Sequence, residues 1–105
     1  MASPGPPFRV VHPERWRQQV VAWAAQAATL GIREEYLAAL KSIQGRLAEA
    51  PMTWGDPQYN LRSLGLTVYR GLCRPLQILY AVDQGLRVVY VMHYRPLPGC
   101  GLEEV

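Results

Sequence analysis

Two neighbouring stretches with helical periodicity constrain the fold of this chain more than any other feature. Between Glu14 and Leu30, apolar side chains recur at three- and four-residue spacing, which predicts a helix with one apolar stripe. After a break at Gly31, a second helix is predicted to end at Pro51. The two stripes are formed by Trp16, Val20, Trp23, Ala27 and Leu30, and by Tyr36, Leu37, Leu40, Ile43 and Leu47. Helices joined by about two residues form a hairpin, and because each has a single apolar face, we expect the pair to pack on a sheet.

The remainder of the chain can supply this sheet. Strands are predicted in residues 8–11, 66–71, 76–82 and 86–94. Tight turns separate the last three strands, which indicates an antiparallel meander, and residues 88–92 are apolar on both faces, which favours an interior position. Residues 52–61 have the composition of a loop. We expect Trp54 and Tyr59, in this loop, either to form a partner-binding patch or to fold back over the helix end.

These elements predict an α+β fold with the order strand-helix-helix-strand-strand-strand, in which a helical hairpin packs on a small, mostly antiparallel sheet. The 105-residue chain has room for one core, which we assign to residues 8–97. Residues 1–7 are expected to be a disordered leader, and residues 98–105 an irregular C-terminal tail. No apolar run reaches the length of a membrane span, and no signal peptide is recognisable, so we expect a cytoplasmic protein with no membrane partner.

The charge distribution points to an anionic partner. The net charge of +3 is built from ten arginines and one lysine, and residues 57–102 carry five arginines against Asp83 alone. Guanidinium groups suit phosphate and carboxylate, so we expect nucleic acid or an acidic protein segment to bind this half of the chain. Cys73 and Cys100 are too few for a zinc site or a disulfide scaffold, and we expect no metal and no cofactor.

Five short stretches, distributed over residues 8–96, resemble the RelE/ParE superfamily of toxins from type II toxin–antitoxin modules. Residues 8–14 (FRVVHPE) are similar to the family's opening strand, which runs into a proline-started helix. Residues 47–57 (LAEAPMTWGDP) resemble its helix end and the loop that follows. Residues 61–64 (LRSL) and 76–82 (LQILYAV) resemble its next loop and strand, and residues 88–95 (VVYVMHYR) its last strand.

This resemblance implies a plasmid-stabilisation-like toxin that is neutralised by a cognate antitoxin. RelE-type members are ribosome-dependent mRNA endonucleases that work without metal, whereas ParE-type members inhibit DNA gyrase by binding it. We favour a ParE-like inhibitor that acts by binding. The alternatives are a RelE-like, RNA-binding endonuclease that acts on mRNA at the ribosome, and an orphan domain that keeps the fold without toxicity.

The candidate functional residues follow from the chemistry of RNA cleavage. The ribose 2′-hydroxyl must lose a proton, the leaving 5′-oxygen must gain one, and the phosphorane charge must be neutralised. His93, whose pKa class suits proton transfer near neutrality, and Tyr94 are the catalytic candidates. The candidates for binding phosphate or an acidic partner are Arg62, Arg70, Arg74 and Arg95. The alternative for each is a structural role: a histidine capping a strand, a packed tyrosine or a solvated arginine.

Two glutamines stand where the resemblance leads us to expect charged groups. Gln58 lies where RelE-type nucleases have an acidic residue, and Gln77 lies where they have an arginine. An amide can neither act as a general base nor neutralise a phosphorane. This difference favours binding over cleavage, unless Asp56 or Arg74 supplies the missing charge.

Overall fold

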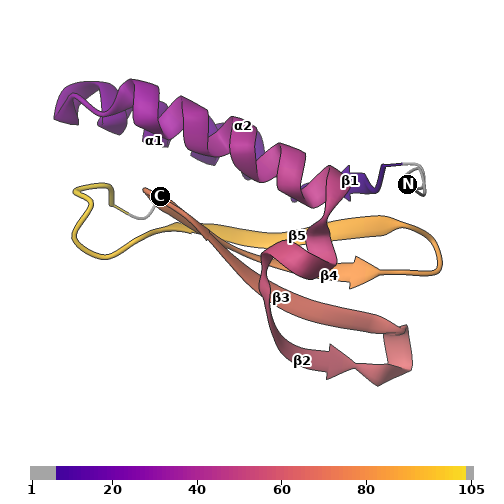
Figure 1. Ribbon diagram of the computed structural model, residues 1–105. Helices are drawn as coiled ribbons and strands as arrows, with labels where there is room; N and C mark the ends of the chain where they lie inside the picture. Colours follow the sequence, from indigo (N-terminus) through magenta and orange to yellow (C-terminus); the bar gives the residue numbers. More distant parts are fainter. Residues whose placement is uncertain (1–6, 104–105) are drawn as a thin grey trace, which may run out of the picture.

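The computed structural model describes residues 7–103 and places two long helices on one face of a five-stranded sheet (Figure 1). The elements in chain order are β1 (Arg9–Val11), α1 (Trp16–Leu30), α2 (Arg33–Glu49), α3 (Pro51–Trp54), β2 (Asp56–Leu61), the 3₁₀ turn η1 (Arg62–Leu64), β3 (Leu66–Cys73), β4 (Leu76–Asp83) and β5 (Val88–Pro96). The predicted leader, residues 1–7, lies outside the described residues except for Pro7, and so do the last two residues of the predicted tail. Within the described part, no helix is long and apolar enough to cross a membrane.

The predicted helical hairpin is present, and its turn is formed by Gly31. This glycine adopts the left-handed conformation with φ 75°, and the N–H of Ile32 donates to the Ala27 carbonyl at 2.9 Å. Both helices bury one stripe against the sheet, and the fully buried members are Trp23, Ala27, Tyr36, Ile43 and Leu47. The prediction was wrong for Leu30 and Leu37, whose side chains are 46% and 41% exposed.

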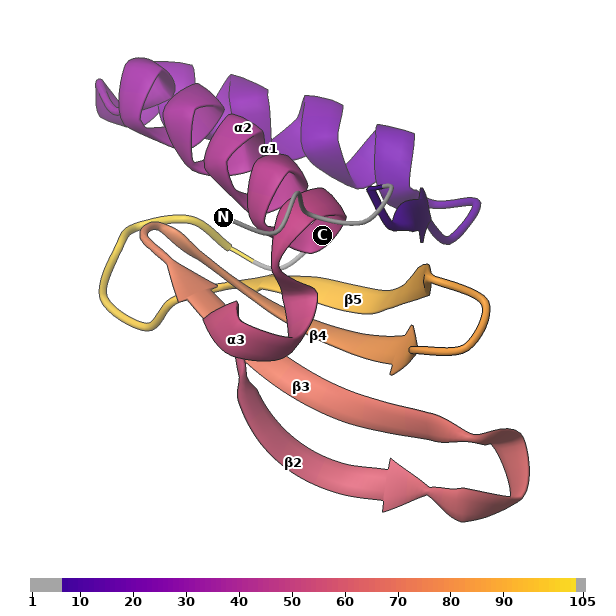
Figure 2. The same ribbon diagram turned by 45° about the vertical axis from the view of Figure 1, so that its right-hand side comes forward.

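The sheet has the order β1-β5-β4-β3-β2 and is mixed. β1 pairs parallel to β5, and every other pair is antiparallel, so the meander of β3, β4 and β5 is confirmed. The interior position of β5, between β1 and β4, is confirmed as well. Figure 2 shows that both long helices lie on the same side of this sheet.

Two elements replace the predicted loop at residues 52–61, namely α3 and the edge strand β2. The composition of this segment is that of a loop, but an edge strand pairs on one side only and therefore tolerates a proline such as Pro57. Trp54 follows the second of the two expectations for the loop aromatics and folds back. Its ring stacks on Tyr80 with centroids 5.9 Å apart, and any side chain at Gly71 would overlap it.

The chain after β5 returns to the first helix. The backbone N–H of Glu103 donates to the Gln26 side chain at 2.7 Å, and its carbonyl accepts a hydrogen bond from the Trp23 indole at 2.8 Å. Leu102 is buried beside them. This C-terminal segment therefore completes the core on the helix-covered side of the sheet.

Candidate functional site

The face of the sheet that points away from the helices carries the candidate site. No element of the described chain covers this face, which we call the open face (Figures 1 and 2). Strand alternation assigns the side chains to it. On β4, Ile78 and Tyr80 are buried under the helices, so Gln77 and Leu79 point to the open face.

The register of the meander brings three predicted residues into adjacent rows of the open face. Arg70 on β3 pairs with Leu79 on β4, which pairs with His93 on β5. In the next row, Gln77 pairs with Arg95. Because cross-strand partners point to the same side of a sheet, the side chains of Arg70, His93 and Arg95 share the open face.

These side chains surround one shallow cavity of about 230 Å³. It is lined by Gln58, Arg70, Gln77, Ile78, Leu79, His93 and Arg95. Two guanidinium groups, one imidazole and two amides therefore converge, and none of the seven lining residues carries a carboxylate. Such a site suits a phosphate, which guanidinium binds through paired hydrogen bonds.

A β-bulge helps to aim His93 into this cavity. The pairing of β4 with β5 shifts between Leu79, opposite His93, and Tyr80, opposite Val91. Bulges of this kind re-aim side chains and occur frequently next to functional sites. His93 is half-buried with its Nδ1 atom fully covered, so its ring lies against the sheet surface.

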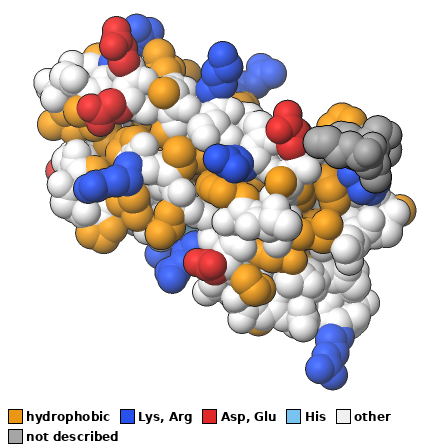
Figure 3. Space-filling model, viewed as in Figure 1, with side chains coloured by type: hydrophobic (Ala, Val, Ile, Leu, Met, Phe, Trp, Pro, Cys, Tyr) orange, Lys and Arg blue, Asp and Glu red, His pale blue; other side chains and the backbone are white. Residues whose placement is uncertain are grey.

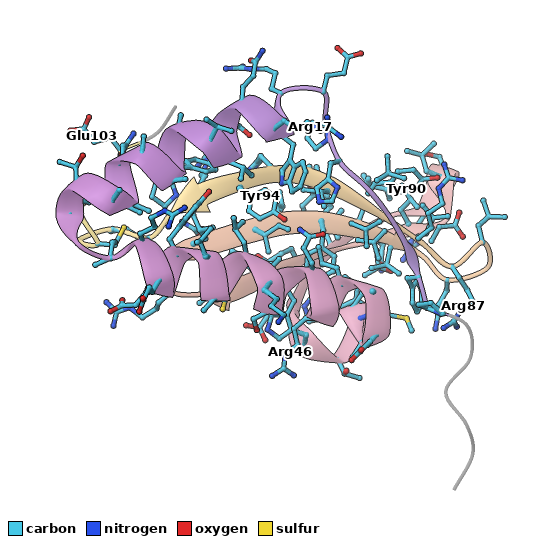
Figure 4. The ribbon with its side chains drawn as sticks, turned by 90° about the horizontal axis from the view of Figure 1, so that it is seen from above. Arg17, Arg46, Arg87, Tyr90, Tyr94 and Glu103 are labelled. Carbon is cyan, nitrogen blue, oxygen red and sulfur yellow. The ribbon has the colours of Figure 1, made fainter. Side chains whose placement is uncertain are left out.

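Tyr94 does not reach the cavity. It lies between α1 and α2 on the helix-covered face (Figure 4), is 3% exposed, and its hydroxyl accepts a hydrogen bond from Gln44 Nε2 at 2.8 Å. Burial raises the pKa of Tyr94 to about 12, and hydrogen bonds from its neighbours oppose this shift only in part. The structure therefore gives Tyr94 the packing role that was the alternative to catalysis.

Two of the predicted arginines also lie apart from the cavity. Arg62 begins the η1 turn, and Arg74 stands in the exposed turn between β3 and β4. Neither lines the cavity that holds Arg70 and Arg95. Gln58 and Gln77, by contrast, both line it, so the two amides that replace expected charges meet at one place.

No metal site is formed within residues 7–103, where no group of three or more His, Cys, Asp or Glu side chains could hold an ion. Cys73 and Cys100 are free, partly buried thiols. On the side of the molecule seen in Figure 3, acidic and basic side chains are interspersed with apolar ones. No lining residue of the cavity is acidic, but Asp56 on β2 is the cross-strand partner of Arg70, so one carboxylate lies beside this arginine on the same face.

Comparison with known proteins bears on the fold. No protein-family model matches the chain, and no curated protein matches it in sequence. Among solved structures, it is similar to a chain of the toxin–antitoxin complex RelBE2 from Mycobacterium tuberculosis, with a TM-score of 0.62 and 14% sequence identity. The superposition covers 90% of this chain and 97% of the other.

The chain has a RelE-like fold. The predicted α+β class and the resemblance in architecture are confirmed by this match. The RelE-like sheet is what sets Arg70, His93 and Arg95 side by side, because three consecutive strands supply them in register.

Proposed function

We propose that this protein is the toxin-like component of a toxin–antitoxin pair, and that it acts by binding an anionic target through the open-face cavity. The observation that carries the proposal is the convergence of Arg70, Arg95 and His93 on a cavity without a carboxylate. The RelE-like fold supports it, because the similar structure is that of a toxin–antitoxin complex. A cognate antitoxin is the second partner that this proposal implies.

Binding without cleavage is the mode of action that the cavity favours. Its two arginines can hold a phosphate in the ground state. Cleavage also needs a general base and further positive charge as the phosphorane forms, whereas Gln58 and Gln77 contribute only neutral amides. We therefore favour an inhibitor that occupies its target, as ParE-type toxins do.

Induced expression in bacterial cells tests the proposal. We expect the native chain to arrest growth and Arg70→Glu to abolish this effect, because reversal of the charge repels an anion. Arg74→Glu is the matched control, since Arg74 is exposed in a turn and does not line the cavity. Co-expression of a small acidic protein encoded next to the gene should restore growth. A native chain that leaves growth unaffected would contradict the proposal and favour an orphan domain.

A ribosome-dependent mRNA endonuclease is the second candidate, and one observation favours it. His93 shares the cavity with both guanidinium groups, so a group able to transfer a proton lies beside groups able to hold a phosphate. Primer extension on a translated message and a gyrase supercoiling assay separate the two modes. Inhibited supercoiling with an intact message supports binding, whereas cleavage abolished by His93→Ala supports the endonuclease.

A further inference from the structure

The side of α2 that points away from the sheet carries a groove. Ile43 is fully buried on the sheet-facing side of this helix, so residues about half a turn away from it point outward. A groove of about 450 Å³ follows this outward side, and its lining includes Ala38, Ser42 and Gly45. Arg46 also lines the groove and lies on the side of α2 away from α1 (Figure 4). We call this part of α2 the outer face.

Gly45 has no evident role within a single copy of the chain. It stands in the interior of α2, where glycine is less favourable to a helix than any residue except proline. A side chain at this position would meet no other described residue within 4 Å of its Cβ atom. The space above the helix is therefore open, and the missing side chain allows the backbone of a second helix to approach closely.

The charges of the outer face are separated along the helix. Glu34 and Glu35 lie in the first turn of α2, whereas Lys41 and Arg46 lie further along it, and all four are exposed. Glu35 and Arg46 are close to three helical turns apart, so they lie on the same flank of the groove. A helix that begins acidic and becomes basic complements a second copy of itself only when the two helices run antiparallel.

We propose that this protein forms a two-fold dimer in which the α2 helices of two copies pack antiparallel along this groove. A register centred between Leu40 and Lys41 sets Glu35 opposite Arg46 of the second copy. Two-fold symmetry repeats this ion pair at the other end of the contact. Lys41 lies on the other flank near the symmetry axis, where its long side chain can keep its ammonium group in solvent. A parallel pair of helices would instead set like charges at the same level.

A second copy fits the outer face better than an acidic partner does. An acidic segment would meet Glu34 and Glu35 as well as Arg46, whereas the open-face cavity offers it arginines and no lining carboxylate. The outer face and the open face lie on opposite sides of the molecule, since both helices cover the other side of the sheet (Figures 1 and 2). The dimer therefore leaves both cavities uncovered, and this inference does not depend on the proposed function.

Sedimentation equilibrium over a range of protein concentrations tests the dimer. One helix from each copy forms a contact smaller than the standard interface of about 1,600 Å², so we expect reversible association in the micromolar range. Glu35→Arg and Arg46→Glu should each raise the dissociation constant by about tenfold or more, because each change turns two attractions into repulsions. An equimolar mixture of the two variants should dimerise like the native chain, because each copy then opposes the reversed charge of the other.

Three controls separate the contact from an effect on folding or on charge in general. Arg17→Glu reverses an exposed charge on α1, away from the outer face, and should leave the dimer unchanged (Figure 4). Arg70→Glu should also leave it unchanged, because Arg70 lines the cavity of the open face. Gly45→Phe should fold as stably as the native chain in urea denaturation but fail to dimerise, because its ring fills the groove.

Three results would overturn the proposal. A native chain that stays monomeric at several hundred micromolar would show that the outer face does not self-associate. Dimers that persist in Glu35→Arg, Arg46→Glu and Gly45→Phe would place the contact on another surface. Monomeric single variants that remain monomeric when mixed would contradict the antiparallel register. The growth assay judges the proposed function separately in each case.

Discussion

His93 and Tyr94 are neighbours in the sequence, and their side chains lie on opposite faces of the sheet. His93 lines the open-face cavity with Arg70 and Arg95, whereas Tyr94 is buried under the helices and bonded to Gln44. Any chemistry at the cavity therefore depends on the His93 imidazole and the two guanidinium groups, and the Tyr94 hydroxyl takes no part in it. Tyr94 instead ties the last strand to α2.

Arg70 and Arg74 form a matched pair for testing anion binding. Both are arginines near the β3–β4 turn, but only Arg70 lines the cavity. We expect Arg70→Glu to weaken binding of a short RNA or heparin strongly and to lower the slope of log affinity against log salt by about one or more. Arg74→Glu should change both quantities much less. Titrations at several salt concentrations measure them.

Equal effects of the two reversals would mean that the arginines act as a diffuse basic surface and not through the cavity. Affinity that does not fall as salt rises would contradict an electrostatic contact altogether, because exposed charges are screened by added ions.

The two cavity glutamines allow a gain-of-function prediction. We expect native protein to cleave a translated message weakly or not at all, and Gln58→Glu with Gln77→Arg to increase cleavage, because both positions line the cavity beside His93. A correctly placed charge commonly changes such rates by about 10²–10³-fold. Primer extension measures the cleavage, and the same double variant with His93→Ala is the control. Robust cleavage by the native chain would contradict this prediction.

The periodic parts of the fold could be predicted because local patterns determine them. The stripes of the hairpin place Trp23 and Ile43 in the core, and the tight turns dictate the antiparallel meander. β2 could not be predicted in this way. Its pairing depends on β3 as a partner, and its path is set by Trp54 seated on Gly71, which is a contact distant in sequence.

The residues of the candidate site could be predicted from the sequence, but which of them share one cavity could not. Sequence chemistry identified His93, Arg70 and Arg95, yet a shift of one residue in register would move every side chain to the other face. The bulge beside His93 fixes that register, and no sequence motif predicts this bulge. Gln58 lies on β2, so its place in the cavity could be recognised only from the structure.

The hairpin core predicts unequal losses of stability along one helix. Ile43 is fully buried, so Ile43→Ala should lower the free energy of unfolding by about 2–5 kcal/mol. Leu40→Ala should have a smaller effect, because Leu40 is only half-buried at the edge of the core. Val21→Ala, at an exposed position on α1, should change the free energy by about 0.5 kcal/mol or less. Urea denaturation measures all three, and a loss at Ile43 as small as that at Val21 would contradict the assigned helix face.

His12 predicts a loss of stability in mild acid. Its ring stacks on Trp16 with centroids 4.0 Å apart, and its Nε2 lies 3.2 Å from Gln44 Nε2, which also donates to the Tyr94 hydroxyl. Burial lowers the pKa of His12 below its usual 6.5, an effect larger than the opposing hydrogen bond from Gln44. The neutral imidazole is therefore the form that the fold prefers.

As the pH falls, the imidazole of His12 is protonated in the unfolded chain before it is protonated in the folded protein. The contribution of neutral His12 to stability is therefore present above about pH 6.5 and is lost as the pH falls toward the lowered pKa. His12→Gln keeps a polar side chain that does not titrate, and His93 is common to both proteins, so its contribution cancels in the comparison. We expect the native chain to lose more free energy of unfolding than His12→Gln between about pH 8 and about pH 5. Urea denaturation at both pH values gives the two differences. A native chain that loses no more stability than the variant would show that His12 is as free to protonate in the fold as in the unfolded chain.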